Sequence, residues 1–299
     1  MSDAVVLKTV LGSYPHTAAL KSGALTSPEV RLAFEDVEPV HKAFAPMVRR
    51  QAYDLSELAV VTALQAFAYD RPVILLPAVI ASRFQRGCLI SYAPRGPVRP
   101  EALADRRIGV RAYTQTTGMW VRAHLAEDYD LPIERMRWVT SDQAHVSEYH
   151  DPDCVEPAPA GRSVLDMLRD GEIDAAILGN DLPKGDDYAP VIPNAAATDR
   201  TWWEKHRFMP INHMVAVSRD AARDHPHAVR AAYRLLVEAD AAVRPADDQP
   251  QRTMFGLEKL RGPLQTTIDT CERQKLLPRK LSVDEVLAQA ADILGDAGL

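Results

Sequence analysis

Three threonines and one glutamine stand where an apolar run passes into a helical pattern. Thr114, Gln115, Thr116 and Thr117 follow the short run 108–110. A helix start has free backbone N–H groups and a partial positive charge, so it attracts a carboxylate or a phosphate. Hydroxyl and amide side chains can donate further hydrogen bonds to the same anion. This stretch is predicted to hold the anionic group of a small ligand, unless Thr116 only caps its own helix.

Two arginines follow another apolar run. Arg83 and Arg86 lie just beyond the segment PVILLPAV, residues 72–79. A guanidinium group binds a carboxylate in a bidentate fork, so two arginines opposite the helix start would form a carboxylate clamp. An arginine at a strand end can instead form a structural salt bridge.

Candidate acid and base groups come from three other segments. Asp54 and Glu57 precede an apolar run, His213 opens the segment HMVAVS, and Ser13 and His16 follow the first apolar run. Histidine titrates near neutral pH, so His213 is the best candidate for a general acid. Asp54 or Glu57 could polarise a substrate hydroxyl, or act as the acid if burial raises its pKa. Structural roles stay open for each: a buried histidine, an acidic pair at a helix start, and an exposed loop histidine.

A group of metal-ligand residue types and a tryptophan pair are weaker candidates. Their spacing matches no closed zinc or manganese site, and the region reads as a surface loop, so we predict no metal. Trp202 and Trp203 could stack on an aromatic ligand or simply seal a core. The possible ligands are His145, Glu148, His150, Asp151, Asp153 and Cys154.

The elements that must position these residues alternate between strands and helices. Apolar runs of strand length alternate with helical patterns, which is typical of an α/β protein with mostly parallel sheets. We expect two lobes: residues 1–93 with 213–299, and residues 94–212. Loops at the carboxyl ends of the strands would then face each other across a ligand cleft.

Composition and charge limit the classes of partner. The chain has 299 residues, 46% hydrophobic and 25% charged, with a formal charge of −6. This charge gives no basic field for nucleic acid or an anionic membrane, so a small solute is the expected partner. The first residues lack the pattern of a secretory signal, and we expect a cytoplasmic protein with reduced cysteines. The sequence leaves a homo-oligomer possible.

Several segments together resemble the 4,5-dihydroxyphthalate decarboxylase family. The likeness extends from about residue 10 to about residue 290, and the order and spacing of the segments are more specific than any single motif. The segments are YDLSEL (53–58), SRFQRG (82–87), ALADRRIGVRAYTQTTGMWVRAHLAEDYDL (102–131), GEIDAAI (171–177), FMPINHMVAVS (208–218) and FGLEKLRGPLQTTIDTCERQKLLPRKLSVDEV (255–286).

The resemblance implies a fold and an activity. The fold is that of type II periplasmic binding proteins, and the activity is a cytoplasmic decarboxylation of a hydroxylated aromatic acid without an organic cofactor. The family pattern is matched by Asp54, Glu57, Ser82, Arg83, residues 114–116, Pro210 and His213. The chain departs from it at Gln85 and Arg86, after Trp138, and at Phe255.

The chemistry of such a reaction defines the roles to be filled. Loss of CO2 from an electron-rich ring requires a proton at the carbon that bears the carboxylate. His213 would deliver that proton, and Arg83 with the helix start would anchor a carboxylate. The rival hypothesis is a non-catalytic solute-binding or sensing protein that captures a carboxylate in the same cleft.

Overall fold

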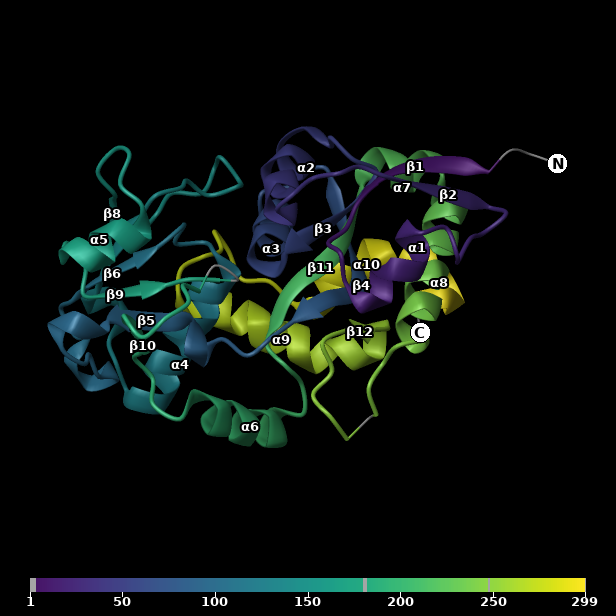
Figure 1. The fold of residues 1–299 in the computed structure, drawn as a ribbon. Helices are drawn as coiled ribbons and strands as arrows, with labels where there is room; N and C mark the ends of the chain where they lie inside the picture. Colours follow the sequence, from purple (N-terminus) through teal and green to yellow (C-terminus); the bar gives the residue numbers. More distant parts are fainter. Residues whose placement is uncertain (1–3, 180–181, 247, 299) are drawn as a thin grey trace.

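The computed structural model describes residues 4–179, 182–246 and 248–298 and has two α/β lobes, each with a six-stranded sheet. The lobes lie side by side in Figure 1, and strand β11 and helix α9 extend between them. The predicted α/β class with two lobes is confirmed.

The first sheet has the strand order β12-β4-β11-β3-β1-β2. Strand β1 pairs in parallel with β2 and β3, whereas β11 runs antiparallel to β3 and β4. Nearly every residue of β4 is buried, as expected for a central strand with both faces covered. The strands are β1 (Val5–Val10), β2 (Val30–Phe34), β3 (Leu55–Ala59), β4 (Val73–Ser82), β11 (Ile211–Ser218) and β12 (Met254–Phe255).

The second sheet has the strand order β10-β5-β9-β6-β7-β8. Strand β6 pairs in parallel with β7 and β9, and β5 runs antiparallel to β9 and β10. The strands are β5 (Leu89–Tyr92), β6 (Arg107–Val110), β7 (Arg137–Thr140), β8 (Val155–Pro157), β9 (Ala175–Ile177) and β10 (Tyr188–Pro190).

Ten α-helices cover the sheets of the described chain. The helix predicted at the threonine stretch is confirmed as α4, which begins at Thr116 and ends at Tyr129. Ser282 caps the last helix, because its hydroxyl accepts a hydrogen bond from the backbone N–H of Glu285. The helices are α1 (Pro15–Lys21), α2 (Phe44–Arg50), α3 (Val60–Ala68), α4 (Thr116–Tyr129), α5 (Val164–Asp170), α6 (Ala195–His206), α7 (Arg219–Asp224), α8 (Pro226–Ala241), α9 (Leu257–Arg273) and α10 (Val283–Leu294).

The chain leaves the first sheet earlier than the sequence suggested. Strand β5 was expected in the first lobe, within 1–93, but it pairs with β9 and β10 of the second sheet. Its apolar pattern gives no information about which sheet it joins, because pairing depends on contacts distant in sequence. The other boundaries of the two lobes stay a prediction.

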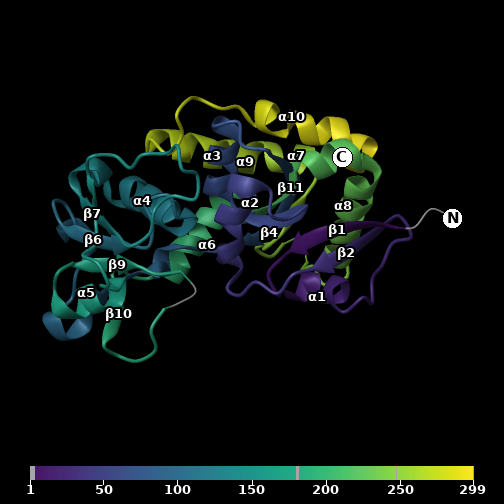
Figure 2. The ribbon, with the colours of Figure 1, turned by 90° about the horizontal axis from the view of Figure 1, so that it is seen from above.

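The lobes share buried structure. One buried cluster includes Phe44 and Leu64 of the first lobe, Trp120 of the second and Leu260 of α9. Helix α9 lies across the first sheet and extends to α4 (Figures 1 and 2). Among the described residues, no helix combines the length and the apolar character needed to cross a bilayer.

Arg86, which lies just before β5, forms ion pairs with residues of two helices. Its guanidinium binds both carboxylate oxygens of Asp128 on α4 at 2.7 and 3.1 Å, and Oδ1 of Asp199 on α6 at 2.7 Å. The Arg86 side chain is only 1% exposed. The prediction that Arg86 binds substrate is therefore corrected, because its donors are engaged by protein carboxylates.

We predict that Arg86→Met lowers the free energy of unfolding by about 3–5 kcal/mol, since the change leaves buried Asp199 without its counter-charge. Urea unfolding followed by circular dichroism measures the effect. Arg106→Met is the matched control, because Arg106 forms an exposed ion pair with Asp174 and its loss should cost at most about 1 kcal/mol. Equal stability losses in the two variants would contradict the structural role of Arg86.

Candidate functional site

A cavity of about 150 Å³ lies where strand ends of both sheets meet. From the first lobe it is lined by residues after β1, at the end of β3 and at the start of β11. From the second lobe it is lined by residues that follow β6, β7 and β9. This is the position expected for a ligand in open α/β sheets. We call it the cleft pocket.

The acid–base pair of the cleft pocket is His213 with Glu57. Nδ1 of His213 lies 2.5 Å from Oε1 of Glu57. The two residues come from adjacent antiparallel strands, β11 and β3, which explains how positions 156 residues apart in sequence meet. The Glu57 side chain is fully buried, whereas His213 is 16% exposed and lines the pocket. His213 therefore faces the cavity, and Glu57 supports it from behind.

Glu57 is held as a carboxylate by three donors. Its Oε2 accepts a hydrogen bond from the backbone N–H of Gly12 at 2.7 Å, and its Oε1 accepts another from the Tyr14 hydroxyl at 2.7 Å. Burial alone would raise the pKa of Glu57, but the hydrogen bond and charge of His213, together with these two donors, lower the pKa below its ordinary value. The prediction that Glu57 contacts a substrate hydroxyl is not supported, because its oxygens face protein donors.

Asn212 and Phe44 hold the imidazole ring of His213. The side-chain nitrogen of Asn212 lies 3.1 Å from Nε2 of His213. Phe44 packs edge-on against the ring, with 5.2 Å between ring centroids. An orienting carboxylate on Nδ1 and a polar neighbour at Nε2 suit a histidine that exchanges a proton at Nε2.

The start of α4 forms another wall of the cleft pocket. Thr114, Gln115, Thr116 and Thr117 all line it. Gln115 is the N-cap residue and makes no side-chain capping hydrogen bond, so the alternative that Thr116 caps its own helix is wrong. Among the described residues, Oε1 of Gln115 is buried without a hydrogen-bond partner. Arg83 donates a hydrogen bond to the Thr117 hydroxyl at 2.6 Å, so this arginine lies beside the helix start.

Further residues that sequence reasoning missed as site residues also line the cleft pocket. They include Tyr14, His41 and Arg111, and also His145, which was considered only as a metal ligand. Nδ1 of His145 lies 2.8 Å from the Thr62 hydroxyl. Burial, then the charge of Arg111, lowers the pKa of His145 to about 4. His145 is therefore neutral at pH 7. No local motif marks it, because it lies in an irregular loop after β7.

Three predicted site residues lie away from the cleft pocket. Asp54 is at the opposite end of β3, where its carboxylate accepts a hydrogen bond from the backbone N–H of Lys8. Ser13 is exposed and accepts a hydrogen bond from the Lys21 side chain. Nε2 of His16 lies 2.9 Å from the carbonyl oxygen of Ile80. These local contacts explain their positions without a ligand.

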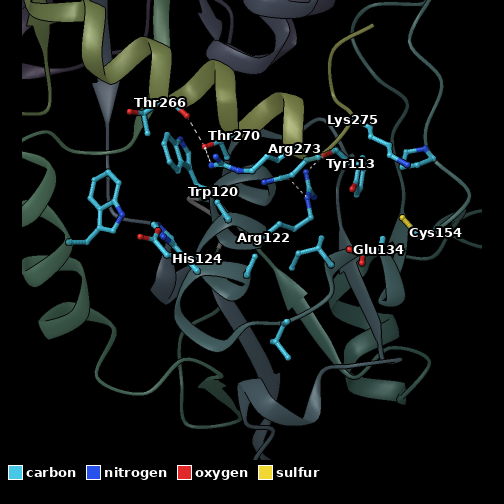
Figure 3. Close-up of a pocket in the computed structure, with 18 of the residues that line it drawn as sticks. Tyr113, Trp120, Arg122, His124, Glu134, Cys154, Thr266, Thr270, Arg273 and Lys275 are labelled. Carbon is cyan, nitrogen blue, oxygen red and sulfur yellow. Dashed lines mark hydrogen bonds between the residues drawn. The ribbon is translucent and has the colours of Figure 1, made fainter. Parts of the chain in front are cut away.

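The structure also tests the possible metal ligands and the tryptophan pair. Within the part of the chain that the structure describes, no three His, Cys, Asp or Glu side chains gather as a metal site would require. Trp202 and Trp203 are buried, and neither lines the cleft pocket. A larger cavity, shown in Figure 3, lies between α4 and α9. It has a volume of about 880 Å³, and Trp202 lines it.

Comparison with known sequences supports a decarboxylase. The chain is 28% identical over 241 residues to a 4,5-dihydroxyphthalate decarboxylase of Comamonas testosteroni, covering 74% of this chain and 70% of the relative. It is 27% identical over 179 residues to a protein of the same name from Pseudomonas putida, covering 57% and 69%. No family model matches the chain. The predicted resemblance to this family is confirmed.

Comparison with solved structures confirms the predicted fold. The periplasmic aliphatic sulphonate-binding protein SsuA of Escherichia coli superimposes with a TM-score of 0.64 at 12% identity, covering 95% of this chain and 97% of SsuA. SsuA of Xanthomonas axonopodis pv. citri, bound to MOPS, gives 0.60 at 13% identity, covering 96% and 99%. The desulfurization enzyme DSZB gives 0.56 at 15% identity, covering 99% of each chain.

We predict that stability falls as the pH is lowered from about 7 to 5, partly because of His145. Its pKa is about 4 in the folded protein and 6.5 ordinarily, so protons bind the unfolded chain first. The stabilisation is fully present above pH 6.5 and is lost as the pH falls toward 4. It amounts to roughly 2 kcal/mol between pH 7 and 5.

Urea unfolding of His145→Gln at several pH values tests this assignment. The variant should lose less stability than the wild type between pH 7 and 5. His150→Gln, which alters an exposed histidine of the same loop, is the matched control. Identical pH dependence in wild type and His145→Gln would contradict it.

Proposed function

We propose that this chain, a relative of 4,5-dihydroxyphthalate decarboxylases, removes CO2 from a hydroxylated aromatic carboxylic acid bound in the cleft pocket. The observation that carries the proposal is the buried Glu57 carboxylate behind His213, in a pocket whose other wall is Arg83 and the start of α4. One wall thus offers a proton donor, and the other offers an anion anchor.

The proposed step breaks the bond between the ring and the leaving carboxylate. The ring carbon accepts a proton from His213, the carbon–carbon bond breaks, and its electron pair returns to the ring as CO2 departs. A hydroxyl ortho or para to that carbon supplies electrons during protonation, so the substrate is its own electron source. We therefore propose that the reaction needs no organic cofactor.

Glu57 is a positioning residue in this scheme. Its Oε1 lies 2.5 Å from Nδ1 of His213 and orients the imidazole ring, which leaves Nε2 to donate the proton. The neutral ring of His145 lines the same pocket and can accept a hydrogen bond from the substrate hydroxyl. In this scheme His213 supplies the proton to the ring carbon, and His145 orients the hydroxyl.

The anion anchor holds a carboxylate that is not lost. Arg83 and the N–H groups at the start of α4 supply the charge, and Thr114, Gln115 and Thr116 add polar side chains. An anchor contributes to rate only if it binds the transition state more tightly than the substrate. We therefore assign it mainly to affinity and orientation.

A second candidate function is capture of a carboxylate without chemistry. The likeness to the sulphonate-binding proteins favours it, because they have the same fold. Measuring CO2 release from a panel of hydroxybenzoates and hydroxyphthalates separates the two functions. Binding without CO2 release from any member would support the non-catalytic function. The cytoplasmic location and a homo-oligomeric state stay predictions.

We predict that His213→Ala lowers turnover by roughly 100-fold to 10,000-fold, the usual contribution of a positioned acid or base. The dissociation constant of the substrate should change much less, because the donor acts mainly in the transition state. Glu57→Gln should also lower turnover, and the double variant should lose less than the product of the two single losses, since both residues serve one step.

Steady-state CO2 release and calorimetric binding measure these effects. The values of kcat and KM test the positioning role: Glu57→Gln should lower kcat and leave KM nearly unchanged, because Glu57 orients His213 and does not contact the substrate. A Glu57→Gln enzyme with a raised KM and an unchanged kcat would exclude this role. Near wild-type turnover in His213→Ala would exclude His213 as the acid.

We predict that Arg83→Lys weakens binding of an aromatic carboxylate by about 1.5–3 kcal/mol, because lysine keeps the charge but loses the planar fork. Isothermal titration calorimetry measures the change. Arg219→Lys is the matched control, since Arg219 pairs with Asp70 away from the cleft pocket. Unchanged affinity in Arg83→Lys would assign Arg83 to structure alone.

A further inference from the structure

A cavity larger than the cleft pocket lies elsewhere in the described structure. It has a volume of about 880 Å³, a size typical of small-molecule sites, and lies between α4 of the second lobe and α9. We call it the α4–α9 cavity. It shares no lining residue with the cleft pocket, and the proposed reaction uses none of its residues. Figure 3 shows its walls.

One wall of the α4–α9 cavity is aromatic. Trp202 stacks on His206, with 4.2 Å between ring centroids, and meets Trp120 edge-on at 6.0 Å. Leu131 and Ile133 also line the cavity. Flat apolar side chains of this kind pack well against a flat aromatic ligand.

The buried side of the cavity has unused hydrogen-bonding capacity. His124 lines it and is 1% exposed, and among the described residues neither of its ring nitrogens has a hydrogen-bond partner. Buried polar groups are normally satisfied, so two open nitrogens on one ring need a reason. Burial and the charge of Arg86 lower the pKa of His124 well below its ordinary value. Its neutral ring offers one donor and one acceptor.

Positive charge surrounds the same space. Arg122 is fully buried, and it donates hydrogen bonds to neutral oxygens, Oε1 of Gln274 and the carbonyl of Tyr113, both at 2.7 Å. Among the described residues its Nη1 has no hydrogen-bond partner, and the guanidinium lies 3.9 Å from the centre of the Tyr113 ring. Asp151 interacts with the Arg122 charge, but no carboxylate of the described chain forms a hydrogen-bonded ion pair with it. Arg273 and Lys275 add two exposed cations at the end of α9 (Figure 3).

The cavity also contains acidic side chains, but they leave the charge balance positive. Glu127 and Glu134 line it, and Glu127 lies 3.4 Å from Lys205, a cation outside the lining. Three cations therefore face two carboxylates, one of which is already paired. This balance favours a ligand with a single negative charge.

We propose that the α4–α9 cavity is a second binding site, for a small aromatic carboxylate. The aromatic body lies against Trp120 and Trp202, and the carboxylate is attracted by Arg273 and Lys275. This site is separate from the cleft pocket and does not depend on the reaction proposed there.

The test uses a fluorescent aromatic anion, 1-anilinonaphthalene-8-sulfonate, with the intact folded chain. It should bind at one saturable site and be displaced by 2-naphthoate. The neutral analogue N-phenyl-1-naphthylamine should bind more weakly than the anion. Displacement by 2-naphthoate would show that the site binds aromatic carboxylates. No displacement at millimolar concentration would overturn the proposal.

Three variants locate the bound probe. Arg273→Gln combined with Lys275→Gln should weaken binding of the anion about tenfold or more, the worth of a lost charged contact, and leave the neutral analogue unchanged. Ala123→Phe, which fills the cavity from α4, should weaken both probes. Lys280→Gln, an exposed cation outside the lining, is the matched control.

The outcomes decide between the cavity and other locations. Circular dichroism and unfolding midpoints must match the wild type before binding is compared. If both the double variant and Ala123→Phe bind the anion as the wild type does, the site is not this cavity. If Arg83→Lys weakens probe binding and the double variant does not, the probe occupies the cleft pocket and the proposal is overturned.

Discussion

The buried carboxylate of Glu57 is the constraint on which the cleft depends. It accepts hydrogen bonds from the loop after β1 through Gly12 and Tyr14, and it pairs with His213 on β11. A buried carboxylate without donors would be costly, so these segments must lie within hydrogen-bond distance of it. The Glu57 charge thereby holds the loop after β1, strand β3 and strand β11 together around the pocket. The reactive side chain is held by the same interactions that keep the charge stable.

The elements near this charge were predictable to different degrees. Helix α4 was predicted at its observed start, because the threonine stretch precedes a long helical pattern. Strand β4 was equally clear, since its apolar run is buried throughout. Helix α6 and the short strands β8, β10 and β12 were missed. Helix α6 is largely polar, and strands of two or three residues show no periodicity, so local sequence carried little signal.

The residues of the candidate site were also predictable to different degrees. His213, Glu57, Arg83 and residues 114–116 were identified because each adjoins a recognisable strand or helix, and the structure brings them together. The prediction that Arg86 binds substrate was wrong because its partners, Asp128 and Asp199, are distant in sequence and no local pattern reveals ion pairs. His145 was misjudged for the same reason: only the tertiary fold carries its loop to the pocket.

The contact between Trp120 and β11 has a consequence for motion. The indole N–H of Trp120 on α4 donates a hydrogen bond to the carbonyl of Ile211 at 2.8 Å, two residues before His213. Ile211 is also where the chain re-enters the first sheet, beside the connection through Arg83. A hinge at these connections would leave α4 attached to the start of β11 through this hydrogen bond. Because His213 belongs to the first sheet and α4 to the second lobe, opening would separate the anion anchor from the proton donor, and closing would bring them together.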